Sequence, residues 1–172
     1  FFLSGKPMAS KGAVASRVYL DKNNNGTFDG GDEPMENVAL LADNAPSERK
    51  SDADGSVALT GLTAHRDTNI SVDRKSLEDP FLTPVFNGAS IVPRPGVFAL
   101  IDIPVVSSGE IDGTVYRRQG KWANEVSDVV VQLVDTSGNL IREVKSAFDG
   151  FYLFDFVKPG KYTVRINPDQ MT

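Results

Sequence analysis

The sequence predicts an all-β protein made of two tandem β-sandwiches. Short segments with alternating apolar and polar residues are separated by turn-forming residues, and no segment of helical length repeats its apolar residues with the period of an α-helix. Many short strands with closely spaced turn signals are typical of sandwiches. The same order of strands and turns occurs twice, which indicates two related domains.

In the first half, alternating apolar residues place the strands between polar turns. The expected strands are residues 13–20, 37–42, 56–62, 69–73 and 97–106. Residues 43–50 are expected to be a polar turn region, because Asn, Asp and Ser dominate turns. Residues 77–96 are rich in proline, which donates no backbone hydrogen bond, so this stretch cannot be an interior strand throughout.

The second half repeats this pattern. Its expected strands are residues 109–116, 128–135, 140–144, 151–156 and 161–166. The pair Val115 and Tyr116 corresponds to Val18 and Tyr19, and the turn glycine Gly150 corresponds to Gly55. The spacings between the two copies are nearly equal, so the two halves are expected to share one fold.

These observations divide the chain into three parts. We expect a leader at 1–12, a first sandwich at 13–106 and a second sandwich at 107–172. The sequence begins with Phe1 rather than Met, so we expect it to be part of a longer polypeptide. No signal peptide is recognised in its opening residues, which lack a basic region.

Residues 21–32 carry the clearest chemical signal. Oxygen-bearing side chains alternate along this run and Gly26 occupies its sixth position, which is the spacing of an EF-hand-type calcium loop. Calcium is a hard cation that takes about six to eight oxygen ligands. The expected metal ligands are the side chains of Asp21, Asn23, Asn25, Asp29 and Asp32 and the backbone carbonyl of Thr27.

Alternatives stay open around this loop. A plain polar turn is one, since Asn, Asp and Gly are common in turns. The last position is usually Glu, and Asp32 is one methylene shorter, so Glu33 or a distant group is a candidate for completing the ligand shell. Asp52 and Asp54 are expected to be turn formers, with a second or shared calcium contact as the alternative.

Composition and charge exclude several function classes. The net charge of -5 argues against nucleic acid as a partner. The absence of cysteine excludes disulfides and thiolate-bound metals. No apolar run is long enough to span a membrane, so direct membrane insertion is not expected. A weak calcium loop would be filled outside the cytoplasm, which favours an extracytoplasmic location at the cell surface, at the outer membrane or in the periplasm.

The second copy carries a family signature between Asp149 and Val164, including Tyr152, Phe154 and the Pro159-Gly160 turn. It resembles the carboxypeptidase-regulatory-like and collagen-adhesin B domains. That resemblance implies an Ig-like or transthyretin-like (prealbumin-like) β-sandwich in which Tyr152 and Phe154 face the core.

The first copy is similar to the calcium-binding B repeats of serine–aspartate-repeat surface adhesins. The similarity rests on the run from Asp21 to Pro34, followed by Val38, and on the turn at Asp54. Short motifs in residues 76–115 resemble the carboxy-terminal parts of Gram-negative outer-membrane usher-like proteins. These resemblances imply a calcium-binding first sandwich in a large surface or outer-membrane protein.

Catalysis is not expected. His65 is the single histidine, sits in a turn and has no Gly-x-Ser-x-Gly nucleophile motif to serve. Pairs of carboxylates occur, but two small domains are not expected to form the large cleft that a glycosidase needs. Trp122 lies in a basic loop; we expect it to fold back over the end of the sandwich, and a contact to a protein or glycan is the alternative.

Two functions therefore follow. The first is a non-catalytic structural, stalk or accessory module, with neighbouring domains of the same polypeptide as partners and with Ca²⁺ making the first sandwich rigid. The alternative is an adhesion module that binds a protein or glycan through loops 77–96 or 117–125.

Overall fold

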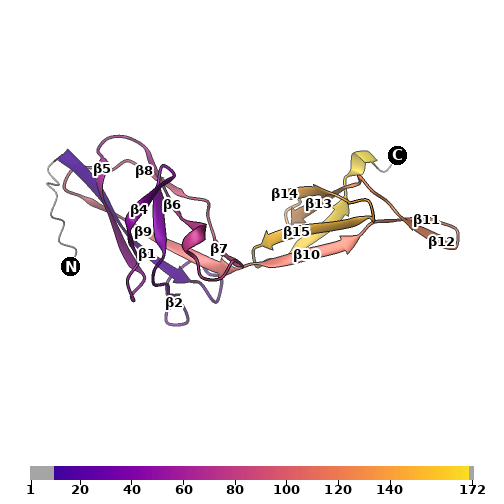
Figure 1. Ribbon diagram of the computed structural model, residues 1–172, viewed down its shortest axis with the longest axis horizontal. Coiled ribbons are helices and arrows are strands. Elements are labelled where there is room, and N and C mark those ends of the chain that lie inside the picture. Colours follow the sequence, from indigo (N-terminus) through magenta and orange to yellow (C-terminus); the bar gives the residue numbers. More distant parts are fainter. Residues whose placement is uncertain (1–9, 171–172) are drawn as a thin grey trace. The chain divides into compact units, whose positions relative to one another are not determined.

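The computed structural model describes residues 10–170 and confirms the all-β expectation. Contacts divide the chain into a unit that ends at Ser107 and a unit that begins at Ser108 (Figure 1). The predicted leader falls mostly outside the described residues, and its last two positions belong to the first strand, which begins at Lys11. No helix among the described residues is long and apolar enough to cross a membrane.

Unit 1 is a sandwich of two sheets. The strands of the first sheet are β1 (Lys11–Leu20), β2 (Glu33–Pro34), β5 (Ser56–Thr63), β7 (Leu82–Pro84) and β9 (Phe98–Ser107). The strands of the second sheet are β3 (Ala39–Ala42), β4 (Ala45–Lys50), β6 (Thr68–Val72) and β8 (Ala89–Ile91), and a short 3-10 turn, η2 (Arg74–Ser76), follows β6.

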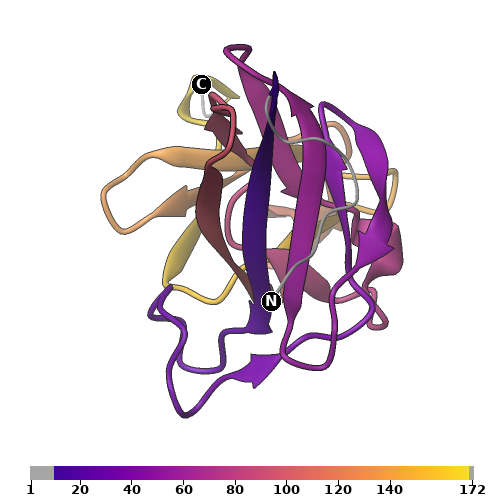
Figure 2. The ribbon, with the colours of Figure 1, turned by 90° about the vertical axis from the view of Figure 1, so that its left-hand side faces the viewer.

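The long strand β1 organises the first sheet. It pairs antiparallel with β5 along one edge and parallel with β9 along the other, and Figure 2 shows it running between these two strands. Its inward residues Val14 and Val18 are fully buried and pack against Leu40 of β3 and Ile70 of β6. The apolar faces of the two sheets therefore close one core, as alternation along the strands predicts.

Strand β4 lies where the sequence suggested only a polar turn, so that prediction was wrong. Asp43 and Asn44 both have positive φ angles and connect β3 to β4 as a two-residue hairpin, with Ala42 opposite Ala45. Two successive residues with positive φ are the signature of a type I′ turn, which matches the twist of the strands that it joins. Because β4 is an exposed edge strand, its sequence lacks the apolar alternation that marks buried strands.

Unit 2 is smaller. Its strands are β10 (Gly109–Thr114), β11 (Tyr116–Gln119), β12 (Trp122–Glu125), β13 (Val130–Asp135), β14 (Leu140–Lys145), β15 (Phe151–Val157) and β16 (Tyr162–Ile166), followed by the 3-10 turn η3 (Pro168–Gln170). Strands β14, β13 and β16 form one sheet, and β10 pairs with β15. Phe154 of β15 is fully buried against Val131 and Leu133 of β13, and Tyr152 is partly buried beside it.

The two units repeat one hydrogen-bond pattern. In unit 1 the Val18 N–H donates to the Gly55 carbonyl at 2.8 Å, and in unit 2 the Val115 N–H donates to the Gly150 carbonyl at 2.9 Å. Both glycines have positive φ, of 73° and 75°. The pairing of Val18 with Gly55 and of Val115 with Gly150 is therefore the physical basis of the sequence repeat.

A buried serine completes the pattern in each unit. The Ser51 hydroxyl donates to the Met35 carbonyl and accepts from the Val38 N–H. In unit 2, Ser146 does the same with the Val126 carbonyl and the Val129 N–H. The segment between the matched strands differs between units: unit 1 has the 21–32 loop and β2, and unit 2 has the β11–β12 hairpin.

Candidate metal centre

The 21–32 loop leaves the end of β1 and returns at β2. Leu20 pairs with Glu33, so Asp21 and Asp32 flank the last pair of the ladder and form the neck of the loop. The Asp21 N–H donates to the Val105 carbonyl of β9 at 2.8 Å. Asp21 is thus held by the sheet, and Asp32 lies one residue before β2. Both residues are buried, with 2% and 9% of their surfaces exposed.

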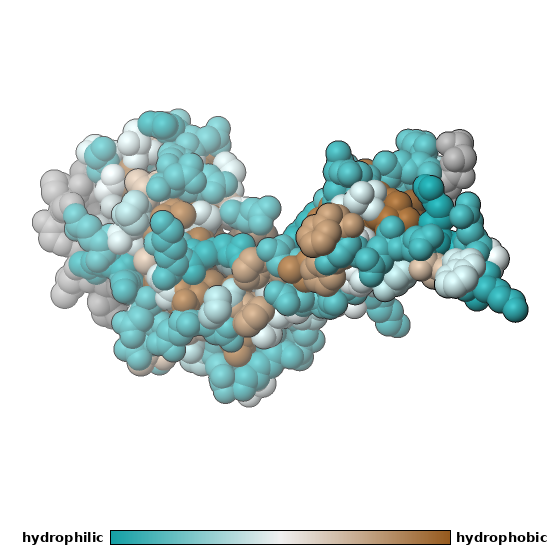
Figure 3. All heavy atoms as spheres, turned by 45° about the vertical axis from the view of Figure 1, so that its right-hand side comes forward, coloured by the Kyte–Doolittle hydropathy of each residue, from teal (hydrophilic) through white to brown (hydrophobic). Residues whose placement is uncertain are grey.

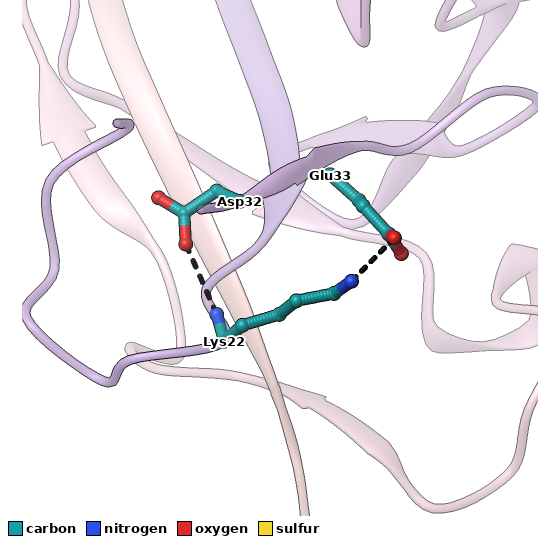
Figure 4. A network of polar contacts seen from close by, with 3 residues as sticks. All are labelled: Lys22, Asp32 and Glu33. Carbon is teal, nitrogen blue, oxygen red and sulfur yellow. Dashed lines mark hydrogen bonds and ion pairs between the residues drawn. The ribbon is translucent and has the colours of Figure 1, made fainter. Parts of the chain in front are cut away.

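Asp32 closes the neck. One carboxylate oxygen accepts the Lys22 N–H at 3.0 Å and the other accepts the Asp29 N–H at 2.9 Å. The Lys22 side chain forms an ion pair with Glu33, so the two charged groups meet outside the loop (Figure 4). Glu33, which the sequence offered as a substitute ligand, is therefore engaged with Lys22.

The first three ligand positions turn their oxygens toward the backbone of the loop. The Asp21 carboxylate accepts the N–H groups of Asn25 at 3.2 Å and Gly26 at 2.8 Å. Asn23 accepts the Asn25 N–H at 3.0 Å, and Asn25 accepts the Thr27 N–H at 2.7 Å. Gly26 has a φ of 73°, which permits the reversal at this point.

Asp29 joins the first half of the loop to its second half through hydrogen bonds. One of its oxygens accepts the side-chain amides of Asn23 at 2.9 Å and Asn25 at 2.8 Å, and the other accepts the Gly31 N–H at 2.9 Å. Hydrogen bonds lower the pKa of Asp29 below its ordinary value: the largest effect comes from the Gly31 N–H and smaller ones come from the Asn23 and Asn25 amides. The Asp29 carboxylate therefore stays charged to a lower pH than an ordinary aspartate.

The chemistry of this donor set fits a hard divalent cation. All of the predicted ligand atoms are oxygens, and each accepting carboxylate or amide oxygen has more than one lone pair. Among residues 10–170, no group of three or more His, Cys, Asp or Glu side chains gathers tightly enough to hold a metal by itself. Amide and carbonyl oxygens would therefore have to supply much of a calcium shell, as they do in loops of this type.

Next to the neck, Tyr19 is fully buried and its hydroxyl has no hydrogen-bond partner among the described residues. Burial, followed by the negative charges of Asp21, Asp102 and Asp32, raises the pKa of Tyr19 to about 12. The sequence did not mark this tyrosine as part of the site. Its position one residue before the end of β1 and two before Asp21 is the signal that was available.

The other sequence candidates divide clearly. Asp52 accepts the N–H groups of Asp54 and Ser56, which makes it the turn former that was expected. His65 is exposed in a turn with a φ of 59°, also as expected. The expectation that Trp122 folds back over the sandwich was wrong, because this side chain is 78% exposed on the β11–β12 hairpin.

Comparison with known proteins gives distant similarities. No family model matches the chain. Over 167 residues it is 28% identical to Colossin-A of Dictyostelium discoideum, a match that covers 88% of this chain and 2% of Colossin-A. The chain therefore spans only a small fraction of the curated relative that it matches.

Solved structures are also only distantly similar. The Bacillus anthracis TIE protein has a TM-score of 0.41 at 15% identity, over 92% of this chain and 28% of that one. A streptococcal ancillary pilin has a TM-score of 0.39 at 12% identity, over 91% and 53% of the two chains. The shaft pilin SpaA of Lactobacillus rhamnosus GG has a TM-score of 0.41 at 8% identity, over 91% and 87%. Such low scores leave the fold to be established by this chain's own strand pairing.

Proposed function

We propose that the chain is a non-catalytic structural module, a stalk, spacer or accessory part of a larger extracytoplasmic polypeptide, whose first sandwich is made rigid by Ca²⁺ bound in the 21–32 loop. The observation that carries this proposal is the neck of the loop. Asp21 and Asp32 are buried beside the Leu20–Glu33 pair, so a cation held by them cross-links the ends of β1 and β2.

Electrostatics favours a bound cation. Asp21, Asp29 and Asp32 bring three carboxylates into one short loop, and the charge of Lys22 is directed outward to Glu33. Like charges within one loop repel one another, and a divalent ion offsets this repulsion. Because Asp32 is shorter than the usual glutamate, we assign the loop to the weak calcium modules that are filled at extracellular calcium concentrations.

The proposed partners are neighbouring domains of the same polypeptide, with no nucleic acid and no membrane insertion. The match to a small part of Colossin-A supports a setting within a long chain. Tandem sandwiches suit this role, because each has its own core and transmits force through paired strands.

The test is thermal unfolding of the full chain in calcium and in a chelator. Calcium at about a hundred times the Kd should stabilise unit 1 by about 2.7 kcal/mol and raise the midpoint of its transition. Asp21→Asn should abolish this rise, because it removes the buried charge at the neck while keeping the shape of the side chain.

Asp135→Asn is the matched control. Asp135 also accepts backbone N–H groups in a turn, those of Ser137 and Asn139, but it lies in unit 2. The calcium effect should persist in this variant. Identical melting curves of the unaltered chain with calcium and with chelator would remove the metal from the proposal.

A further inference from the structure

The β11–β12 hairpin occupies the connection that carries the metal loop in unit 1. The Val18 carbonyl accepts the Met35 N–H at 2.9 Å, and the Val115 carbonyl accepts the Val126 N–H at 3.0 Å. Residues 19–34 in one unit and 116–125 in the other thus leave from and return to equivalent points. The same position in the fold bears two different elaborations, so the hairpin needs an explanation of its own.

The hairpin forms a two-stranded sheet of its own. Within residues 10–170, β11 and β12 pair only with each other, and every residue from 116 to 125 is exposed. Figure 1 shows the hairpin leading away from the other strands of unit 2. Gly120, with a φ of 59°, begins its two-residue turn, which is the favoured place for glycine in a type II′ hairpin. Isolated hairpins are marginal in water, so this exposed extension does little for the stability of the fold.

One face of the hairpin gathers Trp122 with polar groups. Cross-strand partners share a face, so Trp122 lies beside its partner Gln119, and Arg117 lies beside its partner Asn124. The opposite face carries Tyr116, Arg118, Ala123 and Glu125. The hairpin contains three basic residues, Arg117, Arg118 and Lys121, against the single acid Glu125, although the whole chain has a net charge of -5.

We propose that the Trp122 face of the hairpin binds a carboxylate-bearing polysaccharide. An exposed indole offers a flat apolar surface for the C–H face of a sugar ring. Gln119 and Asn124 each have a donor and an acceptor, as sugar hydroxyls require. Arg117 can hold a carboxylate through two parallel hydrogen bonds, and the positive charge of the hairpin attracts an acidic chain.

This arrangement favours a glycan over an acidic peptide. Arginine side chains alone would bind an acidic peptide, and both faces of the hairpin carry an arginine. The indole and the side-chain amides lie on one face only. Figure 3 shows that hydrophobic side chains also reach the surface of unit 2 elsewhere. Phe148, outside the hairpin, is 92% exposed. The argument for a glycan rests on the Trp122 face, where the register places Gln119, Arg117 and Asn124 on the same side as the indole.

The experiment is a fluorescence titration of the full chain with oligogalacturonate in a chelator. Trp122 is the only tryptophan, so its emission reports on this face alone. We expect a saturable blue shift that weakens as salt is added, because exposed charge pairs are screened. The chelator removes calcium from both protein and glycan, so this test stands apart from the metal proposal.

Two variants separate the faces. Arg117→Gln should weaken binding by about tenfold, the effect of losing one charge-assisted pair, while Arg118→Gln on the opposite face should change it less than about twofold. Neutral dextran should give no shift. The proposal is overturned if oligogalacturonate causes no emission shift, or if polyglutamate or dextran causes an equal one. Equal losses of affinity in Arg117→Gln and Arg118→Gln would also overturn it, as would an emission shift that varies with protein concentration and not with glycan concentration.

Discussion

The ring of Phe28 meets the ring of Tyr19 edge to face, with centroids 5.2 Å apart and planes inclined at 67°. The Arg17 guanidinium lies over the same Phe28 ring, 4.6 Å from its centroid. Phe28 belongs to the 21–32 loop, whereas Arg17 and Tyr19 belong to β1. The loop is therefore fastened to the sheet by an aromatic contact in addition to its polar neck.

Replacing Phe28 by Ala should weaken both the loop and the metal site. Phe28 is half-buried, so we expect a loss of about 2 kcal/mol from the free energy of unfolding of unit 1, below the cost of truncating a fully buried phenylalanine. Calcium affinity should fall as well, because the freed loop must be ordered when the ion binds. Chemical denaturation and calcium titration measure the two effects. Phe148→Ala, at a 92% exposed site, should leave both unchanged.

The Tyr19 hydroxyl should ionise at a higher pH than an ordinary tyrosine. Its pKa is raised from 10.0 to about 12, because burial and nearby carboxylates disfavour the tyrosinate. Ionisation of Tyr19 therefore leaves the free energy of unfolding unchanged below pH 10. As the pH rises from 10 toward 12, the free energy of unfolding falls, because the tyrosine ionises more readily in the unfolded chain. In a chelator, ultraviolet absorbance should show a tyrosine ionisation step near pH 12 in the unaltered chain, and Tyr19→Phe should lack that step.

The same variant has a defined effect on stability at neutral pH. Because the buried hydroxyl has no hydrogen-bond partner among the described residues, its removal takes away a desolvation penalty without breaking a bond. Tyr19→Phe should therefore be as stable as the unaltered chain or more stable. A clear loss of stability in denaturant would show that the hydroxyl has a partner, such as a bound water.

The repeated glycines should be irreplaceable in both units. A Cβ at Gly55 would lie 2.3 Å from the Val18 carbonyl oxygen, and one at Gly150 would lie 2.7 Å from that of Val115. Alanine at either site should destabilise its own unit by several kcal/mol, because a positive φ and a steric clash act together. Gly61→Ala is the control: its φ is 82° but no atom lies within 4 Å, so it should cost only about 1–2 kcal/mol. Equal losses at all three positions would show that the clash is relieved by small shifts.

The repeated serines should each contribute by joining two segments. Ser51→Ala leaves the Met35 carbonyl and the Val38 N–H without their shared partner, and Ser146→Ala does so for the equivalent groups of unit 2. We expect each change to cost about 1–3 kcal/mol, the range for buried polar groups left unpaired. Ser90→Ala, at an exposed position of β8, should stay within about 0.5 kcal/mol in the same denaturation assay.

Much of the fold follows from local patterns, and the exceptions have physical causes. The all-β class and the core positions of Val57 and Phe154 follow from alternation and turn residues. Apolar alternation did not predict strand β4, because an exposed edge strand has no apolar face, although Asp43 and Asn44 indicate a turn before it. The bridging roles of Ser51 and Ser146 were not predicted, because the sequence around a serine that joins two segments does not differ from that around any other serine in a turn.

The candidate site was only partly predictable. The spacing of Asp21, Asn23 and Asn25 indicates an oxygen-lined loop, since these side chains bond to the backbone a few residues away. The pairing of Glu33 with Lys22 and the burial of Tyr19 depend on how the loop meets the sheet, which spacing along the chain does not specify.

Three properties can be read from the order of the residues alone: where the chain turns, which residues alternate into a core, and that a loop rich in oxygen ligands occurs in the first copy only. They rest on interactions among near neighbours. Three other properties appear only in the folded chain: β1 pairs in parallel with the distant β9, Phe28 packs on Tyr19, and Trp122 is exposed on a hairpin instead of covering a core. Those outcomes depend on which surfaces remain uncovered once the sheets have paired, and this is settled by contacts between residues far apart in the chain.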